Sequence, residues 1–133
     1  GMSLLHQVEL SLFDMRLHDG ALGDDPTAVL EAVRAEAAVV FPPKTHRFAH
    51  GFIHIFAGLY AGGYYSYLWS EGLAADGFRR FADSDRRDGE AGRAFRDEVL
   101  ARGASRPAAV SFKAFLGRDP DATALMARRG LPA

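Results

Sequence analysis

The sequence contains no cysteine, so it has no disulfide framework, no thiol nucleophile and no cysteine-based zinc site. A reducing, cytoplasmic setting fits this composition. Neither sign of charge dominates, because 16 basic side chains stand against 17 acidic ones and leave a formal net charge of −1. A chain without a net field of one sign is not drawn as a whole to nucleic acid or to anionic lipid. We therefore expect no nucleic-acid partner.

A long, purely apolar run is also missing. Residues 48–70 carry no formal charge, and a stretch of that length raises the question of a membrane span. Histidines, glycines, tyrosines and serines interrupt its apolar residues, which argues against a span. The first residues show acid at Glu9 and no basic lead-in to an apolar run, so we expect no export signal. The sequence therefore predicts no membrane partner.

Strand-like alternation is absent as well, while apolar residues recur at helical spacing along most of the chain. We expect residues 1–133 to form a single all-α domain of about five or six helices with a Gly/Tyr-rich loop. The first predicted helix covers 3–18. The second begins at Asp25 and Pro26, an N-cap acceptor followed by a proline that loses no helical hydrogen bond, and it ends at Pro42-Pro43. Four later helices are predicted. One ends near residue 82, one runs from 91 to 103, one begins around Pro107, and a short one lies around Leu125.

Residues 46–71 do not resemble a rigid core helix. Gly51, Gly58, Gly62 and Gly63 fall within this segment, and each glycine weakens a helix by about 1 kcal/mol relative to alanine. Glycines placed among aromatic residues suit a backbone that bends, approaches a ligand closely or moves as a flap.

Three tyrosines of this segment, Tyr60, Tyr64 and Tyr67, share one face if the segment is helical. A neutral tyrosine donates a hydrogen bond without carrying charge at pH 7. Such a donor, aimed at an oxygen that becomes negative in a transition state, contributes roughly 10²–10³ in rate. The alternative is an aromatic core stripe whose hydroxyls reach water, and spacing alone favours that alternative.

Three histidines, His46, His50 and His54, are also four residues apart and would form a ladder on one helix. No glutamate follows them as in a His-Glu-x-x-His motif, and Gly51 interrupts the run. A metal site made from these three alone is therefore the weakest of our hypotheses. His18 suits a cap or a helix-dipole partner. The arginine pairs at 79–80, 86–87 and 128–129 are typical of solvated faces.

The run from Phe52 to Glu71, FIHIFAGLYAGGYYSYLWSE, closely resembles the C-terminal part of the oligopeptidase A and peptidyl-dipeptidase enzymes. These are zinc metallopeptidases related to thimet oligopeptidase. The flanking runs resemble the same enzymes: VELSLFDMRLH at 8–18, LAADGF at 73–78, FRDEVL at 95–100, FLGRDP at 115–120 and RGL at 129–131. The resemblance thus covers nearly the whole chain and implies the C-terminal part of a larger helical metallopeptidase fold.

The resemblance also implies roles for individual residues. In that family, positions matching His54, Tyr60 and Tyr67 lie across the cleft from the zinc, bind the substrate backbone and stabilise the tetrahedral oxyanion. A mobile glycine-rich loop, here with Gly58, Gly62 and Gly63, assists them, and Tyr64 adds a cleft contact. Leu59 stands where the family usually has glycine, which would stiffen the loop.

The family's zinc site, a His-Glu-x-x-His helix and a further glutamate, lies upstream of the matched region and has no counterpart here. Without it there is no activated water and no general base. We therefore expect no metal ligand or cofactor in this chain, with zinc in the full-length family enzyme. The leading hypothesis is a truncated C-terminal segment of a peptidase for short peptides, inactive without the missing catalytic portion.

The alternative hypothesis is a stand-alone helical module that binds peptides or a protein without catalysis. In either case the surface that would face the catalytic helices is left open. We expect Phe52, Phe56, Tyr65 and Trp69 to be exposed on it. Because a large exposed apolar patch usually finds a partner, we also expect the chain to form a homo-oligomer through this aromatic face.

Overall fold

Helices make up the regular structure of the computed structural model, which describes residues 1–20, 23, 25–84 and 89–132. The all-α prediction is confirmed. The chain divides into two compact units, Gly1–Trp69 and Ser70–Ala133, and each is described by itself. The expectation of one domain over 1–133 stays a prediction.

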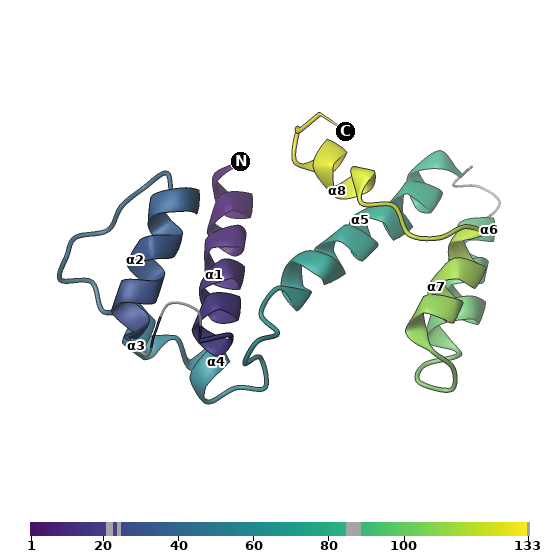
Figure 1. Cartoon of the computed structure of the whole chain (residues 1–133). Coiled ribbons are helices and arrows are strands. Elements are labelled where there is room, and N and C mark those ends of the chain that lie inside the picture. Colours follow the sequence, from purple (N-terminus) through teal and green to yellow (C-terminus); the bar gives the residue numbers. More distant parts are fainter. Residues whose placement is uncertain (21–22, 24, 85–88, 133) are drawn as a thin grey trace. The chain divides into compact units, whose positions relative to one another are not determined.

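The first unit is built on two helices that lie side by side, α1 (Met2–His18) and α2 (Pro26–Ala37) (Figure 1). The predicted cap of α2 is present, since the Asp25 side chain accepts a hydrogen bond from the Thr27 amide at 2.9 Å. The helix ends earlier than predicted. Ala38 already has an extended backbone, so Val40 lies outside the helix and is exposed.

Two one-turn helices, α3 (Phe48–Gly51) and α4 (Ile53–Phe56), complete the core of the first unit. The stripe of α1 that carries Leu10 and Phe13 faces this core, whereas Leu5 and Met15 of the neighbouring stripe are exposed. The other buried members of the core are Val29, Leu30, Ala49, Phe52, Ile55 and Tyr64.

Most of α5 (Ser66–Asp83), together with α6 (Glu90–Phe95), the π-helical η1 (Arg96–Leu100), α7 (Ala108–Leu116) and α8 (Thr123–Arg128), forms the second unit. The predicted helix from residue 91 onward is therefore α-helical at first and π-helical at its end.

An aromatic trio, Phe81, Phe95 and Phe115, packs inside the second unit with ring centroids 5.3–5.7 Å apart. Within the described part of the chain, no helix is both long and apolar enough to cross a bilayer.

Candidate functional site

Four residues predicted to act together do gather in the first unit. His54 lies in α4, Tyr60 and Tyr64 lie in the turn that follows, and Tyr67 lies in the first turn of α5. We call these four residues the tyrosine cluster. The spacing predicted that one continuous helix would bring the tyrosines onto a shared face. In the structure a turn between α4 and α5 brings them together instead.

Ring contacts hold the tyrosine cluster together. The Tyr67 ring centroid is 5.1 Å from that of Tyr60 and 5.0 Å from that of Tyr64. The His54 ring lies 6.1–6.5 Å from all three tyrosine rings. The cluster is therefore a continuous aromatic group.

The members of the tyrosine cluster differ in their exposure. Tyr64 is buried, with its ring edge-on to Phe52 at 5.0 Å, and it belongs to the core of the first unit. By contrast, 37% of Tyr60 and 39% of Tyr67 is exposed. Tyr60 and Tyr67 are thus the tyrosines of the cluster that a ligand can touch directly, and Tyr64 supports them from below.

The two exposed tyrosines also interact through their side chains. A hydrogen bond with Tyr60, reinforced by burial, raises the pKa of Tyr67 above its usual value. Burial raises the pKa of Tyr64. Because an unperturbed phenol ionises near pH 10, both hydroxyls stay protonated at neutral pH and remain hydrogen-bond donors.

The backbone of the turn explains two of the three predicted glycines. A Cβ built on Gly58 would lie 2.5 Å from the backbone oxygen of His54, so no side chain fits there. Gly62 has a φ of +67°, which is the left-handed region that favours glycine. A Cβ on Gly63 would make only ordinary contacts. Gly58 and Gly62 are therefore required by the fold of the turn.

A residue that the sequence reasoning passed over fixes this turn. Asp14 of α1 is fully buried, and its carboxylate accepts hydrogen bonds from the amides of Gly62 at 2.9 Å and Tyr64 at 2.8 Å. His18, expected at a helix end, lies in the last turn of α1 with its Nδ1 2.9 Å from the Asp14 carboxylate. The available signal was an acid between the apolar residues Phe13 and Met15 of the first predicted helix.

Comparison with known proteins shows the family of this chain. The model of peptidase family M3 matches residues 1–131. The chain belongs to this family. It is 44% identical over 131 residues to oligopeptidase A of Escherichia coli, a match that covers 96% of this chain and 19% of the relative.

Other M3 relatives show the same pattern. Oligopeptidase A of Haemophilus influenzae is 41% identical, with 98% of this chain and 20% of the relative covered. The probable cytosolic oligopeptidase A of Arabidopsis thaliana is 36% identical, with the same coverage. The chain thus spans about a fifth of the length of the curated relatives that it matches.

Enzymes of family M3 are metallopeptidases, but the described residues do not fit a zinc ion. They include no group of three His, Cys, Asp or Glu side chains that could hold a metal. The histidine ladder needs one helix, whereas His46 precedes α3, His50 lies in α3 and His54 lies in α4 after a break at Phe52. No metal-dependent step is therefore assigned to these residues.

Three of the four aromatic residues that were expected to be exposed on this M3 chain are exposed. Phe56, Tyr65 and Trp69 are exposed. The prediction that Phe52 is exposed is wrong, because its ring packs against Phe48 at 4.9 Å and against Tyr64. Phe52 belongs to the core beneath the tyrosine cluster.

Among the described arginine pairs of the second unit, three side chains contact acids. Arg79 contacts Asp121 at 3.3 Å, Arg80 contacts Glu90 at 3.6 Å, and Arg129 pairs with Glu71. The pair Arg86-Arg87 and its neighbours Asp85 and Asp88 lie outside the described residues.

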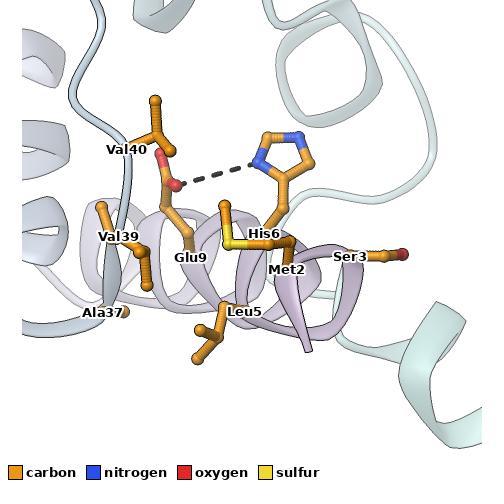
Figure 2. Close-up of a pocket in the computed structure, with 9 residues that line it drawn as sticks. Met2, Ser3, Leu5, His6, Glu9, Ala37, Val39 and Val40 are labelled. Atoms are coloured by element: carbon orange, nitrogen blue, oxygen red, sulfur yellow. Dashed lines mark ion pairs between the residues drawn. The ribbon is translucent and has the colours of Figure 1, made fainter. Parts of the chain in front are cut away.

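A separate hollow of about 300 Å³ lies between the first turns of α1 and the residues after α2 (Figure 2). Its wall is mainly apolar, with Met2, Val39 and Val40 exposed. The His6 imidazole lies 3.8 Å from the Glu9 carboxylate at its edge (Figure 2). None of the predicted site residues lines this hollow.

Proposed function

We propose that this M3 chain supplies the hydrogen-bond-donating side of a peptidase site for short peptides. The observation that carries the proposal is the pair formed by Tyr60 and Tyr67, whose rings lie 5.1 Å apart and are both open to solvent. His54 lies against the same pair. Family membership supports a peptide as the molecule that this surface contacts.

In this proposal Tyr60 and Tyr67 donate hydrogen bonds to the oxyanion that forms when the scissile carbonyl is attacked, and His54 binds the substrate backbone. Neutral phenols suit this role because they stabilise negative charge without a charge of their own to desolvate. Tyr64 supports the pair, and Gly58, Gly62 and Gly63 shape the turn along which the peptide backbone lies.

The attacking water and its activation belong to a part of the enzyme outside these residues. Stabilising an oxyanion does not by itself generate one. We therefore propose that the chain acts together with a zinc-bearing catalytic portion and does not hydrolyse peptides alone. Hydrolysis by the purified chain that a chelator stops and zinc restores would contradict this.

A chimera tests the donor role directly. The matched segment of E. coli oligopeptidase A is replaced by this chain, which 44% identity over 131 residues makes feasible. In the chimera, Tyr67→Phe is expected to lower kcat by roughly 10²-fold with little change in KM, because the lost bond forms mainly in the transition state.

Tyr65→Phe is the matched control, since it removes a phenolic hydroxyl from an exposed tyrosine outside the tyrosine cluster. It is expected to leave kcat unchanged. Equal effects of the two substitutions, or a change confined to KM, would contradict the donor role.

Titration of the purified chain with short unstructured peptides separates the proposal from the binding-module alternative. Saturable binding without hydrolysis favours a binding module. No binding favours the peptidase segment, because the phenol hydrogen bonds of the proposed site form mainly in the transition state.

We also propose that the exposed aromatic face of Phe56, Tyr65 and Trp69 mediates association between copies of the chain. Light scattering across a concentration series tests this. Trp69→Ser should shift the average mass toward the monomer, because Trp69 is 68% exposed and offers the largest apolar side chain of the three. A monomer at high concentration would refute it. The cytoplasmic location stays a prediction.

A further inference from the structure

The Asp14 carboxylate connects α1 to the turn that carries the tyrosine cluster, across about 50 residues of sequence. Its Oδ1 accepts from the Gly62 amide and its Oδ2 from the Tyr64 amide. Each oxygen therefore fixes a different peptide group, and together they set both the position and the direction of the backbone between them.

The environment of Asp14 makes this connection specific. A buried carboxylate is unfavourable unless charge-assisted hydrogen bonds compensate for the lost water. Asp14 is 0% exposed, and the two amides and the His18 imidazole surround its oxygens. His18 Nδ1 also lies 2.8 Å from the backbone oxygen of Asp14, one helical turn earlier in α1. This second contact holds the imidazole in place beside the carboxylate. A Cβ on Gly62 would lie 4.0 Å from the His18 Cβ.

We propose that Asp14 is a positioning residue for the tyrosine cluster. It fixes the amide of Tyr64, whose ring lies between Phe52 and Tyr67. The Tyr67 amide in turn donates to the Tyr64 backbone oxygen at 3.2 Å, so the placement of Tyr64 also determines where α5 begins and where Tyr67 stands beside Tyr60. The catalytic meaning of this placement rests on the proposed function, whereas the test below measures the placement itself.

The competing explanation is that Asp14 only stabilises the first unit. Glu9 provides the comparison, because it is also a buried carboxylate on α1 and accepts a hydrogen bond from Arg34 of α2 at 2.9 Å. Glu9 holds α2 and has no hydrogen bond to the turn at 57–65 among the described contacts. Substituting either residue should lower the stability of the first unit. Only substitution of Asp14 should also disturb the arrangement of the tyrosine rings.

The experiment compares Asp14→Asn with Glu9→Gln in the full chain. An asparagine side chain accepts through one oxygen only, so one of the two amides loses its acceptor. Two-dimensional NMR and amide exchange are expected to show the Gly62 or Tyr64 amide exchanging about tenfold faster, or more, in Asp14→Asn. Glu9→Gln should leave the exchange rates of the Gly62 and Tyr64 amides unchanged.

Ultraviolet titration of the tyrosines gives the second readout. Asp14→Asn is expected to lower the ionisation midpoint of Tyr67 toward the usual phenol value of about 10, because the side-chain hydrogen bond with Tyr60 is lost. Identical amide exchange and tyrosine titration in Asp14→Asn and the unsubstituted chain would overturn the proposal, as would equal changes in both variants.

Exchange in the unsubstituted chain keeps the proposal testable if Asp14→Asn does not fold. The Gly62 and Tyr64 amides should then be protected relative to the amide of Ala61, which directly precedes Gly62, and equal rates at all three positions would overturn the proposal. These readouts do not depend on peptide hydrolysis. A chimera in which Tyr67→Phe has no effect would refute the proposed function and leave the positioning result standing.

Discussion

The aspartate buried in the first unit and the aspartate buried in the second are held in different ways. Asp14 and Asp76 are both 0% exposed. Asp14 accepts from two backbone amides beside one imidazole. Asp76 of α5 accepts two hydrogen bonds from the Arg118 guanidinium, at 2.5 and 2.9 Å, and one from the Asp121 amide at 2.8 Å.

The difference lies in where the compensating charge comes from. The hydrogen bonds from Arg118, followed by that from the Asp121 backbone, lower the pKa of Asp76 below its usual value despite its burial. Among the described contacts of Asp76, one arginine, Arg118, supplies the countercharge. In the first unit the hydrogen bonds are divided among three groups, so the loss of one leaves two.

Arg118→Ala is expected to have the largest effect. It leaves Asp76 buried with one amide and no countercharge, which strongly destabilises a fold. Thermal unfolding at pH 7, followed by circular dichroism, should show a large loss of stability. Arg102→Ala, which removes an exposed arginine of the same unit, should change it little. Equal losses of stability in Arg118→Ala and Arg102→Ala would contradict the view that Arg118 compensates the buried charge of Asp76.

The acid dependence of stability should change in the same variant. In the unsubstituted chain the lowered pKa of Asp76 gives stability that is present above the usual carboxyl pKa of about 3.9. That stability is lost as the pH falls through the lower, folded-state value. In Arg118→Ala the unpaired carboxylate prefers to be protonated, so acidification toward pH 4 should narrow the gap between variant and parent. A constant gap from pH 7 to pH 3.5 would refute this.

His18→Gln is expected to have a smaller effect, because Asp14 keeps both amides. Loss of one hydrogen bond of this kind costs about 0.5–1.5 kcal/mol of unfolding free energy. Urea unfolding measures it. A loss as large as that of Arg118→Ala would show that the imidazole, and not the amides, is the main partner of Asp14.

Glu36→Gln is expected to have the smallest effect of the three. Glu36 forms a two-point hydrogen bond with Arg16 at 2.7 and 2.8 Å, but the pair is exposed and water screens it. The melting temperature should stay within error of the parent, with or without 1 M salt. A loss comparable to that of His18→Gln would contradict the view that burial decides the worth of these carboxylates.

The helices could be predicted from local signals because those signals act over a few residues. Asp25 caps α2 as its position before Pro26 indicated. Gly117 ends α7 in the left-handed conformation, which is the common way for a glycine to end a helix. The end of α2 was placed too late, because the helix already ends at Ala37 and Ala38 has an extended backbone.

The site could be predicted only in part. The resemblance named His54, Tyr60 and Tyr67, and their rings do gather. Spacing alone favoured an aromatic core stripe on one helix. No local sequence pattern indicates that a side chain of another helix, here Asp14, fixes the backbone of this turn. The role of Asp14 and the burial of Phe52 depend on contacts between segments distant in the sequence, and a single sequence without an alignment does not contain them.

The close approach at position 58 also sets a limit for protein engineering. The His54 carbonyl already occupies the space that any side chain would need there. A library that randomises this stretch to alter peptide preference should keep glycine at 58 and vary position 59, whose leucine is fully exposed. Diversity placed one residue earlier would mostly yield unfolded or displaced turns instead of new specificities.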